Sequence, residues 1–178
     1  TEAARAQRER RISSYYDVER GGHYPEAEEI LRAAAGNFKE VLRFLEKDDR
    51  PYRLKLLTVL TQKDYYDCKA DMLEEHLEYA LGYAGQAGVK DDIFVQYVLN
   101  PRLENEELSC WRLGLSEALA EKATQYRENP RLIWTDICEP LCPPTEDAYD
   151  TLRIQPLSAY RSGKASSADQ KNLFVAAA

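Results

Sequence analysis

The sequence predicts a mainly α protein, built as an irregular multi-helix domain with few or no strands. Apolar residues recur at three- and four-residue spacing through much of the chain, and Pro or Gly stands at the ends of several such segments. The chain has 178 residues, of which 44% are hydrophobic and 31% are charged, a composition typical of a globular protein with a real core.

Residues that start and stop helices divide the beginning of the chain into segments. Pro25 precedes the segment 26–35 and Gly36 follows it, which is the usual order of these residues around a helix. Asn37 is placed to cap the next helix, 38–47. The apolar residues of this second segment share one face of a helix: Phe38, Val41, Leu42 and Leu45.

Further helices are expected between residues 51 and 88. Pro51 opens one of them, and the clearest helical period of the chain then covers 68–84, with Gly85 and Gly88 at its end. His76 lies beside the apolar stripe of that helix, and we interpret it as a packed residue because a catalytic base needs a partner. The residues expected to face inward are Leu56, Leu57, Leu60, Leu73, Leu77, Ala80, Leu81 and Ala84.

The second half of the chain is more varied. Residues 91–101 are apolar and β-branched, and they fit either a brief helix or an extended segment. Residues 104–126 have the pattern of a long amphipathic helix whose first turn is acidic, as the helix dipole favours. Residues 130–145 begin as a short helix and end in prolines, and residues 152–167 have the composition of a loop. The first-turn acidic residues are Glu104, Glu106 and Glu107.

Composition and charge argue against several classes of function. The net charge of −7 disfavours a nucleic-acid binder, because such a protein needs a basic face to displace counterions from phosphates. No apolar run approaches the roughly 20 residues that a membrane-spanning helix requires. Cysteines and histidines are not spaced as zinc ligands, so we expect no metal and no cofactor. These residues are Cys68, Cys110, Cys138, Cys142, His23 and His76.

The end of the chain predicts a helix with a defined first residue. Ser166 is placed as its N-cap, and Asp169 stands three residues later, close to the pattern of a capping box. Ser167 then takes the first helical position. Free backbone N–H groups and the helix dipole stabilise an anion at such a position, which also favours a cysteine thiolate there. The residues expected to be buried behind it are Leu173, Phe174 and Ala177.

Three segments of the second half resemble the transglutaminase-like superfamily. "RSGKASSADQKNLFVAAA" (161–178) is similar to the segment that carries the nucleophile helix in that family. "FVQYVLNPRLENEELSCWR" (94–112) resembles a segment that precedes the core in bacterial members, and "PLSAYRSG" (156–163) fits the connection before the nucleophile helix. The resemblance covers roughly residues 91–178.

The resemblance implies a division of the chain and a site. Residues 1–140 would form a helical N-terminal region, and residues 141–178 a linker and the first helix of an incomplete papain-like or transglutaminase-like α+β core. Ser167 matches the family's catalytic cysteine, and a hydroxyl is a poorer nucleophile than a thiolate. The family's later His and Asp have no counterpart in this sequence. Asp169 does not replace them, because residues two apart on a helix face different ways.

The sequence therefore predicts a fragment of a bacterial transglutaminase-like protein that is non-catalytic as given. Ser167 is either native, as in non-catalytic members of such superfamilies, or an engineered replacement for cysteine. The apolar "VAAA" at the end predicts that the natural chain continues. The start at Thr1 is compatible with a removed export signal, which leaves an exported, cell-surface or cytoplasmic location open.

An alternative of a different class also fits the sequence. An α-helical module that binds a protein or peptide partner, without enzymatic activity, would suit the acidic charge and the 12 tyrosines of the chain. This alternative predicts an independently stable bundle with an exposed apolar patch.

Overall fold

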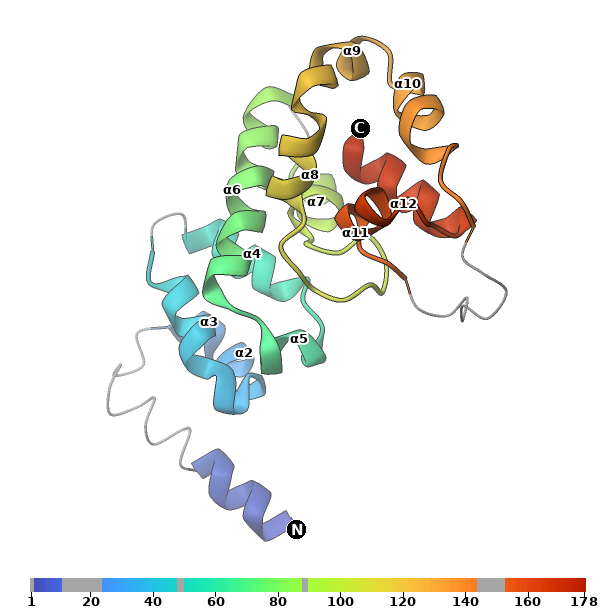
Figure 1. Ribbon diagram of the computed structural model, residues 1–178. Coiled ribbons are helices and arrows are strands. Elements are labelled where there is room, and N and C mark those ends of the chain that lie inside the picture. The colour runs from blue at the N-terminus through green and yellow to red at the C-terminus, as the bar shows by residue number, and fades with distance from the viewer. Residues whose placement is uncertain (1, 11–23, 48–49, 88–89, 144–152) are drawn as a thin grey trace. The chain divides into compact units, whose positions relative to one another are not determined.

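The structure, a computed structural model, is helical in most of the residues that it describes (Figure 1). These residues contain one isolated β-bridge and no strand, so the prediction of a mainly α fold is confirmed. The chain falls into two compact units, 1–100 and 101–178. The boundary that the family resemblance implies, after residue 140, lies inside the second unit. The described residues are 2–10, 24–47, 50–87, 90–143 and 153–178.

The first unit consists of short helices joined by tighter or wider helical turns, which are labelled η. A helix over residues 2–10 comes first. The other elements are η1 Pro25–Ala27, α2 Glu28–Ala33, η2 Ala35–Asn37, α3 Phe38–Leu45, α4 Arg50–Thr58, α5 Gln62–Asp67, α6 Ala70–Ala87, α7 Asp91–Ile93 and the π-helical η3 Phe94–Leu99. Most of the residues predicted to face inward form its core, which includes Val41, Leu42, Leu45, Leu56, Leu57, Leu73 and Leu77. Leu81 is only half-buried, and the side chain of Ala84 lies outside the described part of the structure.

The boundary between the first two predicted helices differs from the sequence pattern. The predicted stop at Gly36 is wrong, since α2 ends at Ala33 and the left-handed residue is Ala35, with a φ of 49°. Asn37 precedes α3 as predicted, but its side chain makes no capping hydrogen bond. Its Nδ2 instead donates to the carbonyls of Tyr65 (3.2 Å) and Cys68 (2.8 Å). The amide therefore fastens the start of α3 to α5.

Three further segments of this unit extend or refine the prediction. The "TQKD" stretch forms a capping box between Thr61 and Asp64, and this cap starts the helix α5, which the sequence reading left out. The helix α6 runs past Gly85 and ends at Ala87, directly before Gly88, the second of the two glycines predicted to mark its end. His76 is fully buried in α6, as a packed residue would be. Of the two alternatives for 91–101, the helical one is confirmed by α7 and η3.

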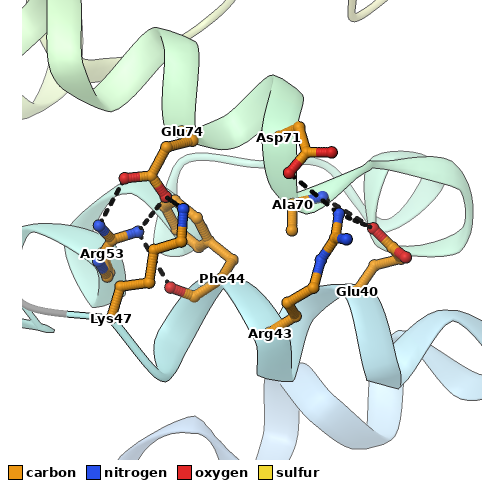
Figure 2. Close-up of polar contacts among 8 residues, drawn as sticks. All are labelled: Glu40, Arg43, Phe44, Lys47, Arg53, Ala70, Asp71 and Glu74. Atoms are coloured by element: carbon orange, nitrogen blue, oxygen red, sulfur yellow. Dashed lines mark hydrogen bonds and ion pairs between the residues drawn. The ribbon is translucent and has the colours of Figure 1, made fainter.

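A buried ion pair joins three helices of the first unit (Figure 2). Arg53 of α4 is 4% exposed, and its guanidinium makes two hydrogen bonds of 2.7 Å to the carboxylate of Glu74 in α6. The same guanidinium donates to the carbonyl of Phe44 in α3 (3.0 Å) and lies over its ring. Lys47 adds a second cation 3.2 Å from Glu74. A carboxylate held by two cations in this way favours its charged form.

A second polar contact joins α3 to the start of α6, beside the ion pair in Figure 2. The carboxylate of Glu40 accepts a hydrogen bond of 3.0 Å from the backbone N–H of Ala70, the first residue of α6. Arg43 pairs with this carboxylate (3.1 Å) and with Asp71 (3.2 Å). A side chain of α3 thus takes one of the backbone donors that a helix start leaves without an intrahelical acceptor.

Replacing Arg53 by Met is expected to lower the free energy of unfolding by about 3 kcal/mol, because it leaves the Glu74 carboxylate without its principal partner. The double variant R53M/E74L replaces the pair by apolar side chains and is expected to recover most of this loss. Urea unfolding followed by circular dichroism measures both values. A loss below about 1 kcal/mol for R53M would place the pair among ordinary surface ion pairs.

The same pair gives stability a defined dependence on pH. The hydrogen bond from Arg53 and then that from Lys47 lower the pKa of Glu74, against the opposing effect of burial. A lowered carboxyl pKa stabilises the folded state above the ordinary value of 4.5, and this contribution is lost as the pH falls through the folded-state pKa. The stability difference between the wild type and E74Q is therefore expected to shrink below pH 4.5 and to stay constant between pH 6 and 8.

The second unit also consists of short helices. Its elements are α8 Arg112–Leu119, η4 Ala120–Lys122, α9 Ala123–Glu128, α10 Arg131–Ile133, the π-helical η5 Trp134–Cys138, α11 Pro156–Ser162 and α12 Ser167–Ala177. A single cluster of buried side chains links them, and it includes Trp111, Leu115, Tyr126, Ile133, Ile137, Leu157, Ala159 and Leu173.

The predicted long helix over 104–126 is wrong in its first part. Residues 101–110 form a loop, and α8 begins only at Arg112. The carboxylate of Glu106 is 2% exposed and accepts from the backbone N–H groups of Leu103 (2.6 Å) and Glu104 (2.9 Å). These short-range hydrogen bonds offer the backbone an alternative to a helix, so an acidic pattern typical of a first turn instead closes a loop.

The segment that the sequence reading assigned to a loop, 152–167, contains the helix α11. Pro156 is its first residue, and Gly163 follows its end in the left-handed conformation, with a φ of 66°. This order of Pro and Gly is the same signal that marked the earlier helices. α11 lies against α8 at Gly114, where an added Cβ would stand 2.6 Å from a methyl group of the buried Leu157.

Replacement by alanine is expected to change the free energy of unfolding in opposite directions at Gly82 of α6 and Gly114 of α8. In α6, a Cβ added at Gly82 meets nothing within 4 Å, so G82A is expected to raise the free energy of unfolding by about 0.5–1 kcal/mol. G114A is expected to lower it by about 1 kcal/mol, because the overpacking against Leu157 exceeds the gain in helix propensity. Thermal and urea unfolding measure both variants. A stabilising G114A would show that α11 yields easily at this contact.

Candidate functional site

The candidate site is the first turn of α12, which the structure places as the sequence predicts. Ser166 is the N-cap in an extended conformation, and Ser167 is the first residue of the helix. The capping box is complete: the Oγ of Ser166 accepts from the N–H of Asp169 (3.2 Å), and Asp169 Oδ2 accepts from the N–H of Ser166 (3.2 Å). The Ser166 hydroxyl also donates to this carboxylate oxygen at 2.6 Å.

Asp169 holds a second segment in addition to the helix start. Its Oδ1 accepts a hydrogen bond of 3.1 Å from the backbone N–H of Ile154, two residues before α11. The side chain is only 3% exposed. Both carboxylate oxygens are thus engaged, one by Ser166 and the other by Ile154. Asp169 therefore acts as a structural acceptor, and it is not directed at Ser167.

The loop that leads to Ser167 is held by backbone hydrogen bonds on its other side. Cys142 and Lys164 form an isolated parallel bridge, in which the N–H of Cys142 donates to Gly163 and the N–H of Ala165 donates to Cys142, each at 3.0 Å. The side chain of Gln170 donates to the carbonyl of Leu141 (3.3 Å). The position of residue 167 is consequently fixed by segments that lie far apart in sequence.

Ser167 itself is exposed, and the described part of the chain forms no hydrogen bond to its hydroxyl. A serine nucleophile needs a general base within hydrogen-bond reach. Of the histidines, His76 is fully buried in α6 of the first unit, and His23 lies outside the described residues. The Ser167 hydroxyl is therefore exposed at the start of α12, and the described residues place no general base beside it.

The rest of α12 is only partly buried. Leu173 is fully buried, as predicted. Phe174 and Ala177 are half-buried rather than buried, because they pack against the core cluster from its margin. The rings of Phe174 and Trp134 make an edge-to-face contact there, with centroids 6.1 Å apart. Val175 is 62% exposed. The Nδ2 atom of Asn172 is buried, and it has no hydrogen-bond partner in the described part of the chain. A buried donor of this kind costs about 1–3 kcal/mol.

Thiol chemistry is limited to two of the four cysteines. None of the four forms a disulfide, and burial raises the pKa of Cys68 and of Cys138 to about 11, which makes these thiols poor nucleophiles at neutral pH. Cys110 and Cys142 are exposed. Among the described residues, no group of three or more His, Cys, Asp or Glu side chains is arranged to hold a metal ion.

Two contacts of the site cannot be predicted from local sequence patterns. The contact of Asp169 with Ile154 and the bridge of Cys142 with Lys164 join positions that are far apart in the chain, and neither has a local sequence signal. The neighbouring helix α11 does have a local sequence signal, because Pro156 is its first residue and Gly163 follows its end.

No family model, curated protein or solved structure matches this chain. The resemblance to the transglutaminase-like superfamily therefore rests on the three quoted segments alone. Within the described residues, every helix is too short or too polar to span a bilayer.

Two residues in the first turn of α12, Ser167 and Asp169, are expected to differ sharply in their importance for stability. D169A removes the acceptor of three hydrogen bonds at a buried position and is expected to lower the free energy of unfolding by about 2–3 kcal/mol. S167A removes an exposed hydroxyl without a partner and is expected to change it by less than about 0.5 kcal/mol. Urea unfolding of both variants gives the comparison. Similar losses for the two would contradict the assigned contacts.

Proposed function

We propose that this chain is a fragment of a bacterial transglutaminase-like protein, in which residue 167 occupies the nucleophile position, and that the chain as given is non-catalytic. The observation that carries the proposal is the place of Ser167: it is exposed, and it is the first residue of a capped helix reached through a fixed loop. This is the order of loop, residue and helix that the quoted resemblance implies.

The absence of catalysis follows from the chemistry of the site. A serine hydroxyl requires a base to become a nucleophile, and the carboxylate in the same helical turn, Asp169, is engaged by Ser166 and Ile154. On this proposal α12 is the first helix of a papain-like α+β core, and residues outside this sequence supply the sheet together with the His and Asp of the triad.

The chain is expected to show no acyl transfer. Incubation with a fluorescent primary amine and a glutamine-containing peptide should give no amine-labelled peptide, for the wild type and for S167C alike, because the described residues place no general base beside residue 167. An active cysteine transglutaminase serves as the positive control in the same buffer. Thiol-independent labelling by the wild type that is lost in S167A would overturn the non-catalytic assignment.

The family assignment has a separate test in the gene. The reading frame beyond codon 178 is expected to encode a "GIPAR"-like continuation with a later His and Asp, and the extended chain carrying S167C is expected to gain amine incorporation. A reading frame without these residues would overturn the assignment.

A second candidate function is a helical module that binds a protein or peptide. The observation that favours it is the exposure of three tyrosines in the first unit: Tyr66 is 53%, Tyr83 50% and Tyr97 68% exposed. Tyrosine supplies contact area at low conformational-entropy cost. This candidate requires a chain that unfolds cooperatively by itself, so a broad, non-cooperative thermal transition would favour the transglutaminase-like proposal over it.

A further inference from the structure

The first turn of α12 contains a buried negative charge next to the nucleophile position. Asp169 is 3% exposed, and its two oxygens only accept hydrogen bonds, which is the pattern of an ionised carboxylate. One of these oxygens lies 3.2 Å from the backbone nitrogen of Ser166, the residue directly before Ser167.

The capping box also occupies backbone donors that an anion would use. The N–H of Asp169 is bonded to the Ser166 hydroxyl, and the N–H of Ser166 is bonded to the carboxylate. The helix start therefore keeps only the N–H groups of Ser167 and Ala168 for another acceptor. The partial charge of a helix N-terminus is about +0.5, whereas the carboxylate contributes a full negative charge in the same turn.

We propose that Asp169 is a positioning residue whose carboxylate disfavours a second negative charge at the start of α12. The helix then holds residue 167 in an exposed position without stabilising an anion on its side chain. A like charge disfavours the ionised form of a neighbouring group, and burial reduces its screening by water. The inference rests on the proposed function only in treating residue 167 as the nucleophile position.

The other charged groups near α12 are weaker candidates for this effect, because they are exposed, paired or stacked on a ring. Asp136 of η5 pairs with Lys122, Arg153 pairs with Glu104, and Arg112 lies over the ring of Trp111. The remaining charged or titratable groups on α12, on its loop and on the helices packed against it are Lys164, Lys171, Arg161, Glu117, Tyr160, Cys138 and Cys142.

The test uses Ser167→Cys as a reporter in a background with Cys110→Ala and Cys142→Ala. The buried Cys68 and Cys138, with pKa values of about 11, react slowly and leave the reporter as the reactive thiol. The pH dependence of its alkylation by iodoacetamide gives its pKa. We expect this pKa at or above the ordinary value of about 8.5, despite the position at a helix start.

Asp169→Asn is expected to lower the pKa of the reporter thiol by at least about half a unit and to speed its alkylation at pH 7 about threefold. Asp136→Asn removes an exposed carboxylate of η5 and is the matched control, which should leave the rate unchanged. Circular dichroism verifies that each variant keeps its helices, and Asp169→Ser is the second variant in case Asp169→Asn does not fold.

Two results would overturn the inference. One is a reporter pKa clearly below the ordinary value while Asp169 is present, which remains decisive even when both Asp169 variants fail to fold. The other is an unchanged or raised pKa in a folded Asp169→Asn variant. Neither result bears on acyl transfer or on the reading frame, so failure of the inference and failure of the proposed function are distinguishable.

Discussion

Short helices leave many backbone N–H groups without an intrahelical acceptor, and the structure depends on how buried or half-buried carboxylates accept hydrogen bonds from these groups. Asp64 caps α5, Glu40 accepts from the first residue of α6, and Asp169 caps α12. Glu106 does the same for a loop rather than a helix. Each of these carboxylates fixes the direction of a segment as well as satisfying a donor. The candidate site is one case of this general solution.

The sequence predicted the elements whose signals are local. The faces of α3, α4 and α6 follow from apolar spacing, and the start of α12 follows from Ser166 and Asp169. The loop before α8 could not be read from spacing, because the acidic residues that suit a helix start also suit a carboxylate that turns back on its own backbone. The helix α11 was missed although Pro156 and Gly163 mark its ends, since its intervening residues have weak periodicity.

The candidate site also has one feature that the sequence predicts and one that it does not. The position of Ser167 at the first turn was predictable, because a capping box is a local motif. The engagement of the Asp169 carboxylate by Ile154 was not, because it joins segments that local propensity does not relate. That contact changes the chemical interpretation of the helix start. A helix N-terminus alone suggests stabilisation of an added anion, whereas the start of α12 is already bonded to the carboxylate of Asp169.

The core of the second unit combines residues from the beginning and the end of its segment of the chain. The unit buries Leu173 of α12 together with Trp111 and Leu115, so its core requires side chains from both ends of the segment 101–178. On a ribosome, a nascent chain that ends before α12 would expose those early apolar residues, because Leu173 would not yet be present to cover them. Folding of this unit is therefore expected to follow its synthesis rather than accompany it, which gives chaperones a period in which to bind the emerging chain.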